Sequence, residues 1–157
     1  MKLLFHNSVA FPLLLLVGTS FLISSTQAQC PKLLWSDEFD GDSLDETKWS
    51  PQVGDGCTLG EDMCGWGNSE WQVYTNEQGP NGNIEVSDGT LKIHAKYDDS
   101  TQSYTSGRLR SLGKADFDMS KPLRIEARMK VPKESKGLWP AFWMMPSQME
   151  MSSWPLG

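Results

Sequence analysis

Tryptophans recur in two blocks of this sequence, Gly65–Thr75, which also has polar side chains, and Gly137–Pro146, which is otherwise apolar. The first block has the sequence Gly-Trp-Gly-Asn-Ser-Glu-Trp-Gln-Val-Tyr-Thr, and the second has Gly-Leu-Trp-Pro-Ala-Phe-Trp-Met-Met-Pro. An indole ring can pack flat against the C–H face of a sugar ring, and its N–H can donate a hydrogen bond. The 7 tryptophans of the chain therefore favour carbohydrate binding, although tryptophans also fill the cores of β-sandwiches.

The contexts of the individual tryptophans separate these two roles. We expect Trp35 and Trp49 to lie in a core. Four others are in turn-like segments and are candidates for a binding surface: Trp66, Trp139, Trp143 and Trp154.

Strands must position these residues, because apolar and polar residues alternate with a period of two and no sustained helical period occurs. We expect strands at 33–39, 71–74, 83–86, 91–97, 104–110 and 123–131. An Asp-Gly pair between the third and fourth runs is a strong hairpin signal. The pattern predicts an all-β fold of short antiparallel strands, a sandwich or a barrel.

Other candidate chemical groups have simpler interpretations. His94 lies on the polar face of its strand, so we expect a solvated residue rather than a ligand or a base. Glu126 and Arg128 share a strand face and are expected to form an exposed ion pair of little energetic value. The acidic residues between Asp37 and Glu46 do not have the spacing of an EF-hand.

The N-terminal residues 1–28 have the pattern of a secretory signal peptide: a positive start, an apolar stretch and a small-residue site ending at Ala28. We therefore expect a secreted, extracellular protein whose mature domain occupies 29–157. The formal net charge of −6 gives no reason to expect nucleic acid or an anionic membrane as a partner.

The chain has three cysteines, Cys30, Cys57 and Cys64. Disulfides are the default in an oxidising compartment. A Cys57–Cys64 bridge would close a small Gly-rich loop, and we favour it, although three single bridges are possible and spacing alone does not choose among them.

The two tryptophan blocks, together with the opening run Trp35–Gly41, resemble glycoside hydrolase family 16, in particular its laminarinase-like endo-β-1,3-glucanases. The resemblance runs from about residue 33 to the end, with the motifs in family order. It implies an antiparallel β-jelly-roll sandwich of the concanavalin A-like type, incomplete in this chain. It also implies a β-glucan polysaccharide as partner and a monomer when complete.

The resemblance further implies retaining hydrolysis by two carboxylates, which lie about 5–5.5 Å apart in such enzymes. In the family, the motif that matches Trp154–Gly157 leads into the strand that carries both glutamates. The catalytic residues are therefore expected beyond Gly157, and 29–157 is expected to be the N-terminal part of the family domain.

Binding residues can be carried over by motif. Asn68, Glu70 and Arg108 would hydrogen-bond sugar hydroxyls, whereas Trp139 and Trp143 would stack on glucosyl rings. A surface arginine and a core tryptophan are the alternative interpretations of Arg108 and Trp143.

No cofactor is required by this chemistry. The resemblance does allow a structural Ca²⁺, with Glu38 and Gly89 as two of its ligands.

Two other functions remain open at the level of sequence. Family relatives that keep the sandwich but lose the glutamates are non-catalytic β-glucan recognition proteins. A transglycosylase or an agar- or carrageenan-directed enzyme is disfavoured by the Gly65–Glu70 block.

Overall fold

The computed structural model describes residues 2–7 (by their backbone), 32–118, 120, 122–133 and 136–146. Its strands, in chain order, are β1 (Lys2–Asn7), β2 (Leu33–Asp37), β3 (Ser50–Pro51), β4 (Gln72–Tyr74), β5 (Ile84–Ser87), β6 (Thr90–Ile93), β7 (Lys96–Asp98), β8 (Ser103–Ser106), β9 (Leu109–Arg110) and β10 (Leu123–Arg128). Two 3₁₀ helices, η1 (Cys57–Leu59) and η2 (Glu61–Gly67), precede β4.

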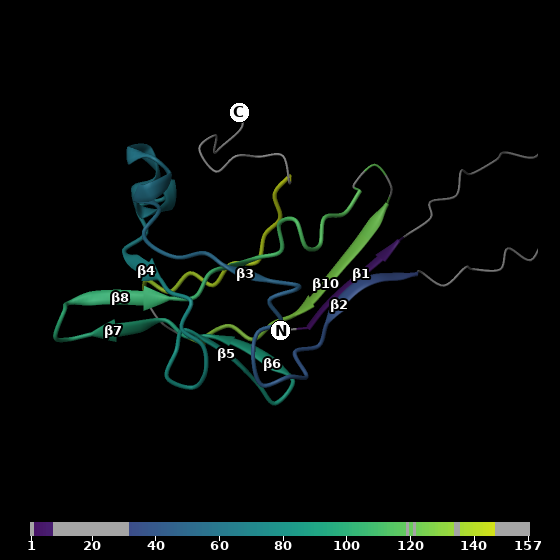
Figure 1. Cartoon of the computed structure of the whole chain (residues 1–157), viewed down its shortest axis with the longest axis horizontal. Helices are drawn as coiled ribbons and strands as arrows, with labels where there is room; N and C mark the ends of the chain where they lie inside the picture. Colours follow the sequence, from purple (N-terminus) through teal and green to yellow (C-terminus); the bar gives the residue numbers. More distant parts are fainter. Residues whose placement is uncertain (1, 8–31, 119, 121, 134–135, 147–157) are drawn as a thin grey trace, which may run out of the picture.

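The strands form four small sheets within the described residues, with the orders β10-β1-β2, β3-β9, β4-β8-β7 and β5-β6 (Figure 1). All but one of the strand pairs are antiparallel. The predicted all-β, antiparallel fold class is confirmed. Among the described residues, no helix is long and apolar enough to cross a membrane.

The exception is the parallel pair of β4 and β8, in which Gln72 lies beside Tyr104 and Tyr74 beside Ser106. A parallel pair needs a crossover connection. Here β5, β6 and β7 provide it, because they intervene in sequence between the two strands. Local alternation in the sequence contains no information on this direction of pairing.

The predicted Asp-Gly hairpin is confirmed by β5 and β6, which pair in register from Ile84↔Ile93 to Ser87↔Thr90. Both turn residues have positive φ, 54° at Asp88 and 65° at Gly89. A two-residue turn of this type matches the right-handed twist of the flanking strands.

The prediction of one strand from 91 to 97 is wrong, because the chain leaves β5 after Ile93 and joins β8 as β7. Buried Asn83 holds the break: its backbone oxygen accepts from His94 N at 2.9 Å, and its Nδ2 donates to His94 O at 2.7 Å. The side-chain amide of Asn83 thus takes the place of one backbone hydrogen bond between the strands.

The predicted strand 104–110 is likewise divided, into β8 and β9, at Gly107 and Arg108. A Cβ at Gly107 would lie 2.9 Å from Ile84 Cγ1 and 3.0 Å from Asn83 O. Only glycine permits this close approach. The predicted strands that begin at 33 and 123 end earlier than expected, at Asp37 and Arg128.

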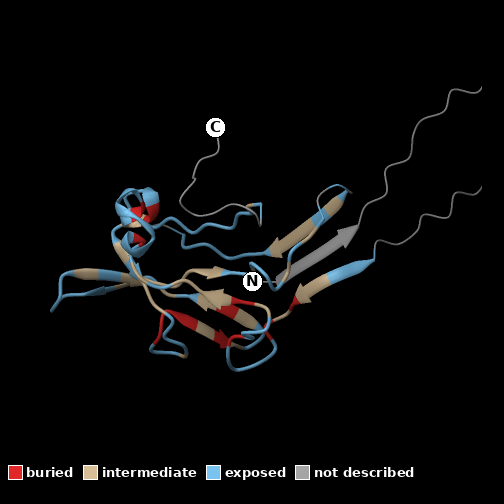
Figure 2. Ribbon diagram, turned by 45° about the horizontal axis from the view of Figure 1, so that its top comes forward, coloured by how far each residue is buried: buried red, intermediate tan, exposed pale blue. Residues whose placement is uncertain are grey.

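The core lies between the β5–β6 hairpin and the loops around it, where the buried positions gather (Figure 2). Its buried members are Phe39, Leu44, Trp49, Ile84, Val86 and Leu91, with Trp35 packed against them. The Trp35 and Trp49 rings meet edge-on at 5.5 Å. The prediction that these two tryptophans belong to the core is confirmed.

Strand β1 lies between β2 and β10 and pairs antiparallel with both. Its residues belong to the predicted signal peptide, and the apolar stretch that follows lies outside the described residues. The pairing concerns the uncleaved chain, so removal of residues 1–28 stays a prediction.

The predicted ion pair of Glu126 with Arg128 is wrong. Glu126 Oε1 pairs instead with Arg124 Nη2, whose side chain is exposed. Residues two apart in a strand share a face, so Arg124 and Arg128 both lie on the same face as Glu126. Spacing alone therefore does not choose between the two arginines.

The buried carboxylate of Asp37 ties β2 to the loop that follows it. Its Oδ1 accepts from Phe39 N at 3.0 Å and its Oδ2 accepts from Trp49 Nε1 at 2.7 Å. Lys48 Nζ lies 3.5 Å from Oδ1. The carboxylate therefore satisfies two buried donors and has a charged partner.

Replacing Asp37 with alanine removes the acceptor of both buried N–H groups. We expect the complete protein to lose about 3 kcal/mol of unfolding free energy, because each unsatisfied buried donor costs about 1–3 kcal/mol. Urea denaturation followed by tryptophan fluorescence measures the loss. The exposed Asp42→Ala provides the matched control, and an equal effect of the two substitutions would show that Asp37 has no such role.

Candidate functional site

The side chain of Arg108 is the centre of the candidate site. Its guanidinium carbon lies 4.2 Å from the centroid of the Trp66 ring, 5.5 Å from that of Tyr74 and 5.4 Å from that of Trp143. A cation over an aromatic face is attracted by the ring quadrupole. Arg108 Nε also donates to Gln52 Oε1 at 3.0 Å. The alternative of a free surface arginine is therefore wrong, since only 13% of its side chain is exposed.

The carboxylate of Glu70 is the counter-ion, with Oε1 3.5 Å from Arg108 Nη1. Its Oε2 accepts from the Tyr74 hydroxyl at 2.5 Å and from Gln72 Nε2 at 2.8 Å. Asn68 Nδ2 approaches Oε1 at 3.5 Å, the long limit of a hydrogen bond. The Glu70 carboxylate thus has donors close to both of its oxygens.

The Gly65–Glu70 motif forms this geometry through a run of left-handed backbone. Gly65, Trp66 and Gly67 have φ values of 62°, 55° and 66°, and Ser69 has 56°. Glycine adopts this conformation without cost, whereas a tryptophan there is strained. A Cβ at Gly65 would lie only 3.0 Å from Glu70 N, so the glycine lets the chain fold back and present Glu70.

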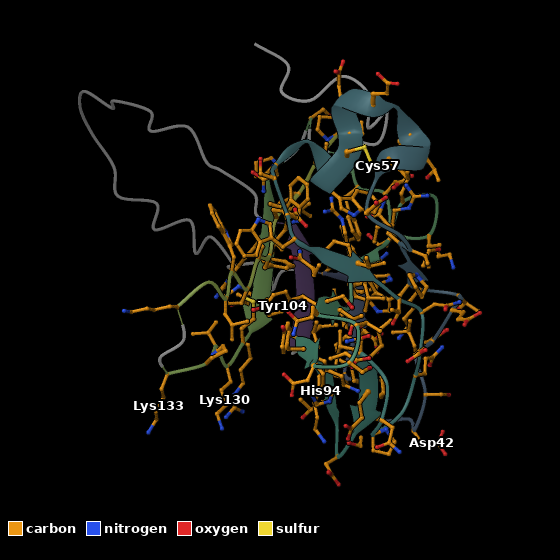
Figure 3. All side chains as sticks on the ribbon, turned by 90° about the vertical axis from the view of Figure 1, so that its left-hand side faces the viewer. Asp42, Cys57, His94, Tyr104, Lys130 and Lys133 are labelled. Atoms are coloured by element: carbon orange, nitrogen blue, oxygen red, sulfur yellow. A yellow bond between two sulfur atoms is a disulfide. The ribbon has the colours of Figure 1, made fainter. Side chains whose placement is uncertain are left out.

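Contacts of the preceding loop hold Trp66 in this conformation. Its backbone N donates to Asp55 O at 3.1 Å, and its indole Nε1 donates to Gly54 O at 3.2 Å. The Cys57–Cys64 disulfide closes the same loop, with Cα atoms 4.1 Å apart, at the upper end of the view in Figure 3. The predicted bridge is confirmed, and it staples a segment with few buried residues.

The predicted residues do not all come together. Asn68, Glu70, Arg108 and Trp143 lie in one cluster, although 48% of Trp143 is exposed. Trp139 is 85% exposed, and within the described residues no hydrogen bond or ring contact ties it to Arg108. The prediction that Trp66 lies on a binding surface is wrong, because the residue is only 6% exposed and the Arg108 guanidinium lies over its ring. Trp154 and Cys30 lie outside the described residues.

Three further residues of the cluster were not predicted. Gln72 and Tyr74 follow Glu70 at a spacing of two, and strand alternation could have placed them on the same face. Gln52 is 56 residues from Arg108 in sequence. Nothing in the sequence links these two residues. We call the set Gln52, Trp66, Asn68, Glu70, Gln72, Tyr74, Arg108 and Trp143 the Arg108 cluster.

Two hollows of the described surface are lined by neither Arg108 nor Glu70. One, of about 210 Å³, adjoins Trp49 and Lys114. The other, of about 320 Å³, surrounds Asp37, Asp40 and Lys48. The central residues of the Arg108 cluster are largely covered, since Trp66 is 6% exposed and the side chains of Arg108 and Glu70 are 13% and 17% exposed.

Glu38 and Gly89, the two predicted Ca²⁺ ligands, are neighbours. A Cβ at Gly89 would lie 4.0 Å from Glu38 O and 3.8 Å from Asp40 Oδ1. Yet the described residues contain no group of three or more His, Cys, Asp or Glu side chains that could hold a metal ion. These residues alone do not fit the ion, and the Ca²⁺ site stays a prediction.

His94 lies outside the cluster, with Nε2 3.0 Å from Glu85 Oε2 on the polar side of the β5–β6 hairpin. Hydrogen bonds from Lys92, Ser87 and His94 lower the pKa of Glu85 to about 2. His94 is thus partly exposed on the polar side of its strand and paired with a carboxylate. That it is neither a ligand nor a base stays a prediction.

Burial, and then the hydrogen bond to Glu70, raise the pKa of Tyr74 above its ordinary value of 10.0. The neutral phenol therefore stabilises the fold fully below about pH 10, and this contribution is lost as pH rises through the folded pKa. We expect the unfolding free energy of the wild-type protein to fall more steeply above about pH 10 than that of Tyr74→Phe. Urea unfolding at several alkaline pH values measures both slopes.

The exposed Tyr97→Phe is the control for this measurement and should follow the wild-type slope. Parallel curves for the wild type and Tyr74→Phe would show that the Tyr74 hydroxyl does not bond to the carboxylate.

Sequence comparison finds relatives among glucan-degrading enzymes. The chain is 38% identical over 152 residues to a beta-glucanase of Rhodothermus marinus, which covers 93% of this chain and 48% of that protein. It is 37% identical over 155 residues to a glucan endo-1,3-beta-glucosidase of Cryptopygus antarcticus, covering 95% and 49%. The chain thus spans about half the length of these curated relatives. No family model matches it.

Among solved structures, the chain is similar to the laminarinase from Flavobacterium sp. UMI-01. The sequence identity is 41%, the TM-score is 0.46, and the match covers 55% of this chain and 33% of that chain.

Proposed function

Because the chain is a homologue of the beta-glucanases and endo-1,3-beta-glucosidases of the laminarinase type, we propose that the complete protein is a secreted glycoside hydrolase of family 16. Its substrate is a β-1,3-glucan or a mixed β-1,3/1,4-glucan, and its mechanism is the retaining one with two carboxylates.

The observation that carries this proposal is the Arg108 cluster. A flat guanidinium lies over an indole ring and beside a carboxylate, with Trp143 at 5.4 Å. Sugar rings need aromatic surfaces for their C–H faces and paired polar groups for their hydroxyls. In the cluster, the half-exposed Trp143 ring is the aromatic surface for a sugar, and Arg108 and Glu70 are the paired polar groups.

Glu70 is a binding group rather than one of the two catalytic carboxylates in this proposal. A general acid must hold a proton, and a nucleophile must have an oxygen directed at the anomeric carbon. The Glu70 oxygens instead accept from Tyr74 and Gln72 and face Arg108. With its oxygens engaged in this way, Glu70 serves to orient the arginine and sugar hydroxyls.

Arg108 is the donor that we assign to the sugar. A guanidinium carries five N–H donors in a planar fork. Gln52 and Glu70 engage its Nε and Nη1, and these two contacts use fewer than five donors. The remaining fork can donate to two neighbouring hydroxyls.

A non-catalytic β-glucan recognition protein would use the same cluster, since the cluster binds and does not perform chemistry. The two functions differ in one measurement. The hydrolase releases reducing ends from laminarin, whereas the recognition protein binds laminarin without releasing them.

We expect the complete protein to hydrolyse laminarin and its Arg108→Ala variant to lose about 10- to 100-fold in kcat/KM. A hydrogen bond to a charged group contributes about 1.5–3 kcal/mol, and about 1.4 kcal/mol is tenfold. A reducing-sugar assay over a range of laminarin concentrations measures the loss.

Arg110→Ala is the matched control, because Arg110 is exposed on β9 two residues away. Its kcat/KM should stay within about twofold of wild type. Laminarin binding without any reducing-end release by the wild type would favour the recognition protein, and no binding at all would refute both functions.

Secretion is the second part of the proposal. The signal-peptide pattern of residues 1–28 supports it, and so does the Cys57–Cys64 disulfide, since such bonds persist in oxidising compartments. Cleavage would remove β1 and leave β2 and β10 without their shared neighbour.

We therefore expect N-terminal sequencing of the protein from a culture medium to begin at Gln29. The matched control is Ala28→Arg, which places a long cation at the small-residue site and should block this cleavage. A secreted protein that begins at Met1 would instead show that β1 is a retained strand of the sheet.

A further inference from the structure

Two exposed tyrosines lie side by side on the sheet that carries part of the Arg108 cluster. The rings of Tyr97 on β7 and Tyr104 on β8 have centroids 4.7 Å apart and an interplanar angle of 43°. They are 46% and 45% exposed. Figure 3 labels Tyr104 in the middle of the molecule, away from the disulfide loop. No role in the Arg108 cluster accounts for these rings.

The strand registers place this pair on the same face as the cluster. Tyr97 is directly opposite Tyr104, and Tyr104 is directly beside Gln72. Side chains that are opposite each other in paired strands point to the same face. Gln72 in turn donates to Glu70 Oε2 and to the Tyr74 hydroxyl. Gln72 therefore joins the tyrosine pair to the Arg108 cluster.

On the other face of these strands, β8 contacts a buried residue of the neighbouring hairpin segment. Thr105 and Lys96 are opposite each other in register. Thr105 Oγ1 accepts from buried Asn83 at 3.2 Å, and Lys96 Nζ donates to Asn81 O. The tyrosines thus point away from the core, to the side where Tyr74 and Arg108 lie.

We propose that Tyr97 and Tyr104 form a second sugar-binding platform, which stacks on a glucosyl ring of a β-1,3-glucan at a distance from the ring bound by Arg108. This inference rests on the proposed function. Tyr104 and Arg108 are four residues apart, so a near-extended chain separates their Cα atoms by about 13 Å. That span exceeds one sugar ring, so the platform contributes only to longer glucans.

The chemistry of the pair suits a neutral polysaccharide. Two tilted rings present a broad apolar surface with a hydroxyl at each edge, which is what an amphipathic sugar ring requires. A nucleic-acid base could also stack on tyrosine, but it brings a phosphate backbone that needs cationic partners. Two acidic residues, Asp98 and Asp99, follow Tyr97 in the sequence, so the surroundings disfavour a polyanion.

The test compares oligosaccharides of two lengths on the complete protein. Stopped-flow tryptophan fluorescence gives Kd for laminaribiose and laminarihexaose before hydrolysis proceeds. We expect the double variant Tyr97→Ala/Tyr104→Ala to bind laminarihexaose about three- to tenfold more weakly and laminaribiose within about twofold of wild type. The double variant Tyr97→Phe/Tyr104→Phe keeps both rings and should retain most of the affinity for the hexaose.

The outcomes separate this inference from the proposed function. If the wild type binds both oligosaccharides and the alanine variant loses nothing with the hexaose, the platform is refuted and the proposed function stands. If the alanine variant loses equally with both lengths, the tyrosines act within the first site and the platform is also refuted. If the wild type binds neither, the proposed function and the platform fail together.

A second measurement uses only the wild-type protein, so its result does not depend on whether the variants fold. Tetranitromethane nitrates exposed tyrosines, and peptide mass spectrometry locates the product. Laminarihexaose should protect Tyr97 and Tyr104 of the wild-type protein, whereas laminaribiose should not. Equal nitration with and without the hexaose would overturn the proposal.

Discussion

The ion pair of Arg108 with Glu70 is the interaction on which the candidate site depends. Their side chains are only 13% and 17% exposed. Withdrawing two charges from water is costly unless other hydrogen bonds satisfy them. Here Tyr74 and Gln72 donate to the carboxylate, while Gln52 accepts from the guanidinium. The pair can form only when the β3 segment, the disulfide loop and β4 are all in place.

The sequence predicted the local parts of this arrangement and missed the distant ones. Alternation and the Asp-Gly turn were sufficient to predict the β5–β6 hairpin, because the residues that determine this hairpin are neighbours in the sequence. The break after Ile93 depends on the side chain of Asn83, and the division of β8 from β9 depends on the approach of Gly107 to Ile84. Such contacts join separate strands, so the alternation of residues along one strand does not predict them.

The same distinction applies to the site itself. Asn68, Glu70, Arg108 and Trp143 were identified by their motifs, and the fold brings them together. Gln52 could not have been identified, since its contact with Arg108 spans 56 residues. The Gly65–Glu70 motif also did not show why its glycines are needed. The left-handed turn from Gly65 to Gly67 explains them, because it lets Glu70 fold back over Gly65.

The electrostatic balance of the cluster determines the kind of ligand that it suits. An unpaired arginine on this face would favour an anion, but Glu70 neutralises Arg108 at close range. The aromatic rings around the pair add a surface without net charge. What remains is a set of oriented donors and acceptors between aromatic faces. A neutral ligand rich in hydroxyls is complementary to such a surface, and a charged one would have to be desolvated without a compensating partner.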